Sequence, residues 1–316
     1  MKKIRWPTCL ALSTALLLLT GCGQPEVEEK ADAVIGVSVL TMTNPFFCEL
    51  AEAMVDEGAK HNYKVIVTSG EYNVANQKNQ VNDFIVKQVD AIVLCPCDSK
   101  AIGTSIAAAN EAGIPVFTAD IACLAEGVKV VSHVATDNLG GGRKAAEAVI
   151  EMLGGTGKVA VIDFPEVESV ILRTTGFDEV ISKVPGIKVV TVLPGGGDRG
   201  KSFKVAQDVL QSYPDLDGFF AINDPSGLGV AAAIEKAGKT ERIKVVAFDA
   251  QPDGRKGVKE GKLYATIVQY PEKIGRKTID AIRRYLAGEK VEPEILIPCT
   301  IYRKADADAD PTLKDK

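Results

Sequence analysis

The sequence predicts an α/β protein with two lobes, each built on a parallel β-sheet that helices cover on both faces. From residue 33 onward, short runs rich in valine and isoleucine alternate with longer segments of helical periodicity. The runs are apolar throughout, which is typical of parallel strands buried on both faces. About ten strands approach the limit of one open sheet, so the sequence favours two sheets and therefore two lobes.

Helical segments separate most of the predicted strands. The segment after the first strand carries Phe46, Leu50 and Met54 at helical spacing, and the segment after the second carries Val81 and Phe84 in the same way. Apolar side chains three and four positions apart form one face of a helix, which can pack on a sheet. The strands are expected at residues 33–40, 63–69, 91–95, 114–119, 129–135, 158–164, 187–193, 218–223, 243–249 and 263–269.

The N-terminal segment predicts export and a lipid anchor. Three basic residues precede an apolar run, residues 10–19, that is shorter than the roughly 20 residues needed to span a bilayer. Residues 1–21 therefore predict a cleaved signal peptide. The sequence LTGC at 19–22 resembles a bacterial lipobox, in which Cys22 carries the lipid; an ordinary signal peptide with a chance cysteine is the alternative. Residues 22–32 predict the lipidated cysteine and a polar tether, and the protein is expected in the cell envelope or periplasm, anchored to a membrane.

Charge and cysteine content narrow the partners further. The chain carries a net charge of −5, and loss of residues 1–21, with three basic and no acidic residues, brings it to −8. An acidic body without a basic cluster argues against a nucleic-acid partner. Five cysteines remain after Cys9 and Cys22. We expect most of them to be small buried hydrophobes, and a bridge between Cys97 and Cys123 is left open.

Polar side chains follow most of the predicted strands. In parallel sheets, ligands bind beyond the carboxyl ends of the strands. Any one of these residues can instead cap a helix, but five strands that end this way favour a site. Carboxylates, carboxamides and a guanidinium suit adjacent hydroxyl groups, which both donate and accept, so a neutral polyhydroxylated ligand is predicted. The residues are Thr41, Asn44, Cys95, Asp98, Asp120, Asn223, Asp224, Asp249 and Gln269, with Arg173 in the segment 166–177.

One stretch, GGGDRGKS at 195–202, fits the pattern of a phosphate-binding loop between an apolar run and a helical segment. Nucleotide hydrolysis would also need groups that hold Mg²⁺ and orient water. Export to a compartment poor in ATP opposes that function. We therefore interpret the stretch as a glycine-rich turn before a helix.

No enzyme activity is predicted. His61 and His133 have no obvious nucleophile beside them, and the sequence contains no serine-hydrolase, zinc-protease or dinucleotide-binding motif at the expected places. The acidic stretch 306–310 resembles the start of a calcium loop, but a proline stands where that loop needs glycine. No metal site and no cofactor are therefore expected.

Seven segments resemble the periplasmic ribose-binding proteins, which belong to the pentose and hexose solute-binding family of ABC transporters. The resemblance implies two Rossmann-like lobes joined by a hinge of three crossing strands, closing on a sugar. It implies an N-terminal lobe of 33–136 plus 270–298 and a C-terminal lobe of 137–269 plus 299–304, followed by an acidic flexible tail at 305–316. The similar segments are 43–47, 98–116, 131–138, 173–177, 220–238, 245–254 and 265–275.

The resemblance also implies a ligand set. Three departures from the family pattern bear on the ligand. Ile121 stands where the family has an arginine, Cys95 where a polar residue is usual, and Gly197 where an aromatic ring is expected, unless Tyr72 or another ring fills that place. These departures favour a larger sugar or a polyol over ribose. The implied polar ligands are Asn44, Asp120, Arg173, Asn223, Asp249 and Gln269, and the implied apolar contacts are Phe46, Phe47 and Phe248.

The resemblance thus implies a monomeric solute-binding lipoprotein that delivers a monosaccharide or polyol to the permease subunits of an ABC importer. A ligand-sensing partner of a chemoreceptor or sensor kinase is the first alternative, and an exported nucleotide-binding protein the second. A transcriptional regulator with this fold would carry a DNA-binding segment where this chain has the lipobox.

Overall fold

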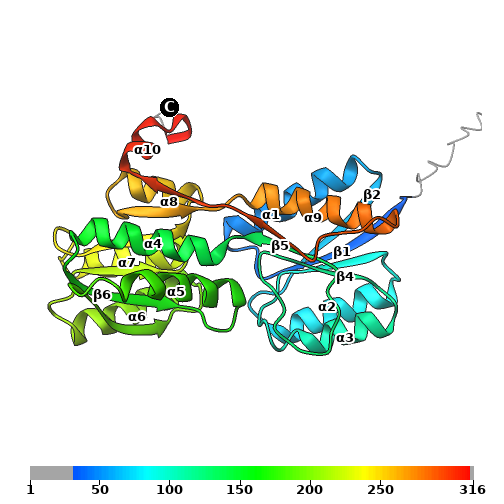
Figure 1. Ribbon diagram of the computed structural model, residues 1–316, viewed down its shortest axis with the longest axis horizontal. Helices are drawn as coiled ribbons and strands as arrows, with labels where there is room; N and C mark the ends of the chain where they lie inside the picture. The colour runs from blue at the N-terminus through cyan, green and yellow to red at the C-terminus, as the bar shows by residue number, and fades with distance from the viewer. Residues whose placement is uncertain (1–30, 314–316) are drawn as a thin grey trace, which may run out of the picture. The chain divides into compact units, whose positions relative to one another are not determined.

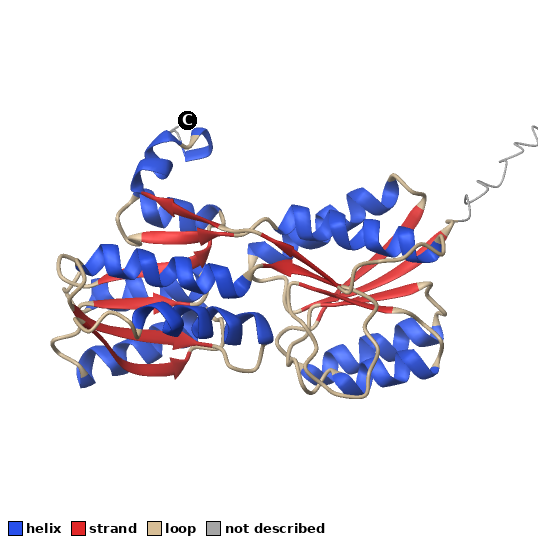
Figure 2. Ribbon diagram, viewed as in Figure 1, coloured by secondary structure: helices blue, strands red, loops and turns tan. Residues whose placement is uncertain are grey.

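The computed structural model describes residues 31–313, which form one compact unit. The predicted signal peptide, Cys22 and nearly all of the tether lie outside the described residues, as do the last three residues of the chain. The described residues form an α/β fold with two lobes, each with its own six-stranded sheet, which confirms the predicted fold class (Figures 1 and 2).

The N-terminal lobe has a fully parallel sheet with strand order β11-β5-β4-β3-β1-β2. Helices α1 and α9 pack side by side on one face, and α2 and α3 pack on the other (Figure 1). The strands are β1 Ala33–Val39, β2 Tyr63–Ser69, β3 Ala91–Leu94, β4 Val116–Ala119, β5 His133–Thr136 and β11 Glu294–Ile297. The helices are α1 Pro45–Ala59, α2 Val74–Val86, α3 Gly103–Glu111 and α9 Pro271–Leu286.

The C-terminal lobe has strand order β12-β10-β9-β8-β6-β7, parallel except for the edge strand β12, which runs antiparallel to β10. Helix α4 packs along α5, and α6 along α7. The strands are β6 Gly157–Asp163, β7 Ile187–Pro194, β8 Gly218–Ala221, β9 Lys244–Asp249, β10 Ala265–Val268 and β12 Thr300–Arg303. The helices are α4 Asn138–Leu153, α5 Glu168–Ile181, α6 Arg199–Ser212, α7 Asp224–Lys236, α8 Pro252–Lys259 and α10 Lys304–Ala309.

The chain crosses between the lobes three times: from β5 to α4, from β10 to α9, and from β11 to β12. The carboxyl ends of the parallel strands of both sheets therefore face the region of the crossings. A ligand is expected in that region, because the polar residues that follow the predicted strands gather there.

Close packing of α4 on α5 fixes the helix that carries Arg173. A Cβ atom on Gly142 would lie 2.0 Å from the carbonyl oxygen of Arg173, and one on Gly176 would lie 2.1 Å from that of Leu139. Any larger residue at either position would push the helices apart. The approach lets Arg173 reach Asn138, the first residue of α4, with a hydrogen bond of 2.9 Å.

All ten predicted strands are present, with small differences at their ends, but β11 and β12 were not among them. Both are four-residue strands at the edges of their sheets, and three of the four side chains in each are exposed or half-buried. Their lengths and positions follow from pairing with β5 and β10.

The expectation of a flexible tail from residue 305 differs from the structure. The chain forms α10 and then a 3-10 turn, Pro311–Leu313, on the C-terminal lobe beside α8. Ala307 is fully buried, and the hydroxyl of Tyr302 donates to the Asp310 carboxylate at 2.7 Å. The segment is rich in acidic residues and therefore predicts a solvated tail, although Ala307 and the bond between Tyr302 and Asp310 fix it to the lobe.

The five cysteines of the described residues are all free thiols. The bridge between Cys97 and Cys123 that the sequence left open is therefore not formed. The Cys97 thiol instead donates to the carbonyl of Leu40 at 3.7 Å, and burial raises the pKa of Cys97 to about 12.

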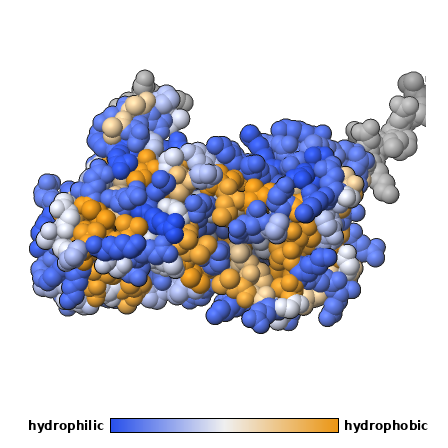
Figure 3. Space-filling model, in the orientation of Figure 1, coloured by the Kyte–Doolittle hydropathy of each residue, from blue (hydrophilic) through white to orange (hydrophobic). Residues whose placement is uncertain are grey.

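The surface is mixed in character. Figure 3 shows hydrophilic side chains interspersed with apolar ones over the face drawn. Among residues 31–313, no helix has the length and apolar character needed to cross a membrane.

Candidate ligand-binding site

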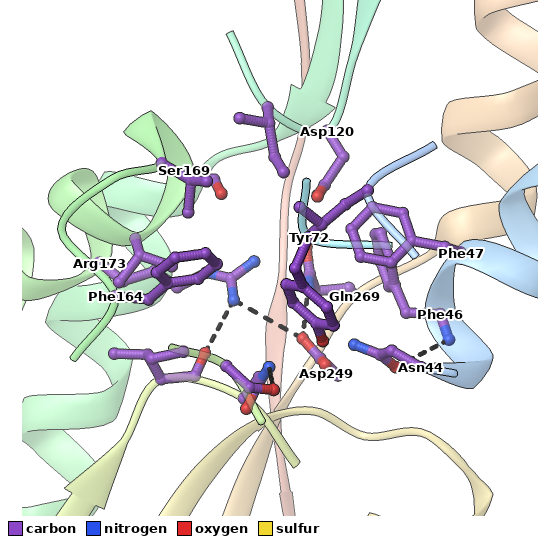
Figure 4. A pocket seen from close by; sticks show the side chains of 17 residues that line it. Asn44, Phe46, Phe47, Tyr72, Asp120, Phe164, Ser169, Arg173, Asp249 and Gln269 are labelled. Atoms are coloured by element: carbon purple, nitrogen blue, oxygen red, sulfur yellow. Dashed lines mark hydrogen bonds and ion pairs between the residues drawn. The ribbon is translucent and has the colours of Figure 1, made fainter. Parts of the chain in front are cut away.

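A cavity lies between the lobes at the carboxyl ends of the strands (Figure 4). With the lobes in this arrangement the cavity has a volume of about 30 Å³, room for about two water molecules and well below the roughly 300–1,000 Å³ of ligand pockets. The N-terminal lobe contributes Leu40, Asn44, Phe46, Phe47, Tyr72, Asp120 and Ile121. The C-terminal lobe and its crossing segment contribute Phe164, Val167, Ser169, Val170, Arg173, Gly197, Ile222, Asn223, Asp249 and Gln269.

Cys95 and Phe248 do not line this cavity. Cys95 is fully buried under α2, and its carbonyl accepts a hydrogen bond of 2.8 Å from Gln77. The ring of Phe248 lies beneath Arg173, with the guanidinium carbon 3.9 Å from the ring centroid. Both therefore support the site from outside. Thr41, Asp98 and Asp224, which the strand-end pattern also indicated, do not line it either. Eight predicted residues line the cavity together: Asn44, Phe46, Phe47, Asp120, Arg173, Asn223, Asp249 and Gln269.

Arg173 is the positive centre of the cavity and is almost fully buried. Its Nε donates to Asn138 at 2.9 Å, and its Nη1 donates to the carbonyl of Ile222 at 2.8 Å. Nη1 also lies 3.6 Å from Oδ1 of Asp249. Within the described residues these bonds use Nε and Nη1, so Nη2 is available to a ligand. With Phe248 beneath it, the guanidinium is held in one orientation, which favours recognition of a fixed pair of acceptors.

Asp249 and Gln269 connect the cavity to the crossing segments. Gln269 Nε2 donates to Asp249 Oδ1 at 2.6 Å, and Thr136 donates to Gln269 Oε1 at 2.7 Å. Burial raises the pKa of Asp249, while Arg173, Gln269 and the facing side chain of Asn44 act to lower it. Two crossings, those after β5 and β10, thus meet at one hydrogen-bonded chain that ends in the cavity.

Asp120 is a fully buried carboxyl of the cavity with an unused acceptor. Its Oδ1 has no hydrogen-bond partner among the described residues. Burial raises the pKa of Asp120 to about 7; Arg173 opposes this rise, and Asp249 and Glu168 add to it. An unsatisfied buried acceptor costs roughly 1–3 kcal/mol, so a hydroxyl donor from a ligand would be favoured at this atom.

The backbone at two strand ends is strained. Asp120 has φ = 62° and Asp249 has φ = 111°, values that residues other than glycine rarely adopt. Such conformations persist only where the surroundings impose them, and they cluster at functional sites. Both carboxyls are thereby turned into the cavity.

Two asparagines both cap a helix and line the cavity. Asn44 accepts from the backbone of Phe46 at 3.0 Å at the start of α1, and Asn223 accepts from that of Ser226 at 2.9 Å at the start of α7. The amide nitrogen of Asn223 also donates to Gly197 at 3.0 Å. The alternative of capping is thus correct for both residues and does not exclude a role in binding, because the cap fixes the rotamer that faces the cavity.

Apolar rings form the remaining walls. Phe46 and Phe47 meet edge to face at 5.1 Å on the N-terminal lobe. Phe164, which was not among the predicted site residues, lines the cavity from the C-terminal lobe. A Cβ on Gly197 would lie 3.3 Å from the Phe164 ring, so this ring takes the space that a side chain at position 197 would enter. The position of Phe164 at the end of a predicted strand, directly before Pro165, is the feature of the sequence that indicates a place at the cavity.

The glycine-rich turn at 195–202 is already filled by the protein's own groups. Asp198 caps α6, and its Oδ1 accepts from the backbone of Lys201 at 2.7 Å. The hydroxyl of Ser202 is buried and turned toward the carbonyl of Gly195 at 3.5 Å. A carboxylate thus occupies the helix N-terminus where a phosphate would bind. This geometry agrees with the interpretation as a turn before a helix.

The chain is similar in sequence to known periplasmic binding proteins. The model of a periplasmic binding protein domain matches residues 35–290. The ribose import binding protein of Bacillus subtilis is 36% identical over 91% of this chain and 95% of its own. A xylitol-binding protein of Mycolicibacterium smegmatis is 30% identical over 79% of this chain and 72% of its own.

The fold has close matches among solved structures. A solute-binding protein of an ABC transporter from Agrobacterium vitis, solved with bound alpha-D-tagatopyranose, superposes with a TM-score of 0.84. It is 29% identical, and the match covers 89% of this chain and 97% of that one. Together with the two-lobed fold and the cavity at its strand ends, these matches show that the chain belongs to the periplasmic binding protein domain family, in the group that includes the ribose import binding proteins.

Proposed function

We propose that the protein is the solute-binding component of an ABC importer and that it binds one monosaccharide or polyol between its lobes. The observation that carries this proposal is the convergence of Arg173, Asp120 and Asp249 from different elements on one cavity between the lobes. The relatives that bind ribose, xylitol and tagatopyranose support the ligand class, and their differences leave its individual member open.

The charge balance of the cavity favours a neutral ligand. One guanidinium, Arg173, faces two carboxyls, Asp120 and Asp249, so an acidic sugar would add a third negative group to a buried site. Hydroxyl groups can donate to the carboxyls and accept from Arg173 Nη2. A wrong epimer would leave one of these buried groups unpaired, at a cost of roughly 1–3 kcal/mol.

Binding acts through closure of the lobes and involves no chemical step. The lobes already contact each other outside the cavity: the backbone N–H of Ser99 donates to the carbonyl of Glu166 at 2.9 Å, and its hydroxyl accepts from the backbone of Glu168 at 2.9 Å. A ligand that touches both lobes stabilises this closed arrangement by the difference between its affinities for the closed and open forms. The closed form is then the form that the permease would recognise.

Lipidation at Cys22 completes the proposal. It would keep the binding protein at the membrane surface, near its permease, because two or three acyl chains anchor a folded domain stably. The motif at 19–22 supports this step.

The test is thermal unfolding and calorimetry of the protein from Gly23 onward against pentoses, hexoses, ketohexoses and sugar alcohols, with Mg-ATP as a further compound. A ligand at about a thousand times its dissociation constant adds roughly 4 kcal/mol, which raises the melting temperature by several degrees. A shift with one sugar or polyol is expected. No shift with any of them, or a shift with Mg-ATP alone, would overturn the proposal.

A further inference from the structure

Two aromatic side chains, one from each lobe, meet at the edge of the cavity. Tyr72 lies between β2 and α2, and Phe164 follows β6. Their ring centroids are 6.3 Å apart, with ring planes at 52°. Figure 4 shows the two rings as neighbours in front of the polar groups of the cavity.

A second hollow of about 380 Å³ is lined by the same two rings. Charged side chains line it, among them Asp98, Glu166 and Lys201. Tyr72 and Phe164 line both spaces, and they are the two residues that the inner cavity and the outer hollow have in common. The pair therefore stands between a small inner cavity and a wider, charged outer hollow.

We propose that Tyr72 and Phe164 form an aromatic partition that limits the ligand to one unsubstituted sugar ring or one short polyol. The partition separates the inner cavity from the outer hollow, and it forms when the lobes meet, because each lobe supplies one ring. A substituent directed at the partition would have to displace a ring and so would oppose closure. This inference rests on the proposed function, since it concerns the size of the ligand in the same cavity.

The backbone holds both rings in place. Tyr72 has φ = 56°, and its N–H donates to the carbonyl of Leu40 at 3.1 Å. A residue with a side chain keeps a positive φ only where its surroundings impose it, which indicates that the ring position is enforced. On the other lobe, the missing side chain of Gly197 leaves the room that the Phe164 ring occupies.

Besides limiting the size of the ligand, Phe164 should strengthen its binding. The flat face of an aromatic ring covers the C–H surface of a sugar, and Phe46 and Phe47 already supply one such wall. Phe164 adds another from the C-terminal lobe. Its loss should therefore weaken binding of the free compound while it widens the range of compounds bound.

The test compares the wild type with Phe164→Ala and Tyr72→Ala, using calorimetry. The probes are the sugar or polyol that the wild type binds most tightly, and each of its mono-O-benzyl ethers. Phe203→Ala is the matched control, since Phe203 is also half-buried but lies on α6 with Lys236 over its ring. Melting temperatures of the four proteins establish that each is folded, and Tyr72→Ala provides a second route if Phe164→Ala unfolds.

In the wild type and the control, an ether whose benzyl group is directed at the partition should bind at least about 100-fold more weakly than the free compound, because that group clashes with the rings. Phe164→Ala should bind the free compound roughly 2- to 10-fold more weakly, and at least one ether as well as the free compound. If both alanine variants discriminate as the wild type does, or if the wild type accepts all the ethers, the partition is wrong. If the wild type binds no sugar or polyol, the proposed function fails instead.

Discussion

Replacing Asp120 with asparagine should make the unliganded protein more stable and the ligand less tightly bound. The carboxyl of Asp120 is fully buried, and its Oδ1 has no partner among residues 31–313. Folding therefore disfavours its ionised form, whereas a sugar hydroxyl would favour it. Asparagine has the same shape but no charge. The exchange should therefore change the stability of the unliganded protein and the affinity for the ligand in opposite directions.

The magnitude follows from the pKa. Burial raises the pKa of Asp120 from 3.8 to about 7. Between these values the unfolded chain has lost the proton while the folded protein still holds it, so this group lowers stability as the pH rises from about 4 to about 7. At about 1.4 kcal/mol per pH unit, the loss reaches up to about 4 kcal/mol above pH 7. A hydrogen bond to a charged group contributes about 1.5–3 kcal/mol, so the ligand should bind roughly 10- to 150-fold more weakly to Asp120→Asn.

The assay is urea unfolding of the wild type and of Asp120→Asn without sugar, at pH values from 4 to 8, followed by calorimetry with the best ligand at pH 8. Asp208→Asn is the control, because Asp208 is exposed on α6 and undergoes the same chemical exchange. The two curves should diverge as the pH rises, with the variant more stable at pH 8. Parallel curves would refute the buried charge of Asp120, and affinities within threefold of each other would refute its contact with the ligand.

Three further changes test other parts of the molecule. Arg173→Ala should abolish measurable binding and also destabilise the protein by about 3–5 kcal/mol, because it leaves Asp249 buried without its charged partner; urea unfolding that shows no loss would contradict this. Lys201→Ala should leave sugar affinity unchanged within twofold, since α6 is capped by Asp198; loss of binding by calorimetry would reopen the phosphate-loop interpretation. Cys22→Ser should move the protein from the membrane fraction to the soluble fraction on cell fractionation, and retention in the membrane would argue against the lipid anchor.

Much of the fold could be predicted because apolar runs mark buried parallel strands. The same rule missed β11 and β12, which are short edge strands whose existence depends on pairing with distant strands. It also missed the folded C-terminal segment, where one buried alanine, Ala307, provides too little apolar sequence to notice. Local composition predicts elements that are stable through their own burial, and it fails where long-range contacts decide.

In the site, too, some residues could be found from local sequence and others depend on long-range contacts. Strand-end polar residues could be found because the carboxyl ends of parallel strands meet, and five of the nine named from that pattern line the cavity together with Arg173. Phe248 could not be distinguished from a ligand contact, since only the three-dimensional packing places it under Arg173. Phe164 was missed because its role depends on the absence of a side chain at Gly197, more than thirty positions away in the sequence.

The chain of hydrogen bonds from Thr136 through Gln269 to Asp249 means that cargo and hinge are not mechanically independent. Two of the three segments about which the lobes would rotate are tied to a group that lines the cavity. A molecule that bonded to Asp249 or Gln269 would therefore stiffen the axis of rotation, whereas one that merely filled the space would not. The chemical identity of the bound molecule, and not only its presence, would then change how long the lobes stay together.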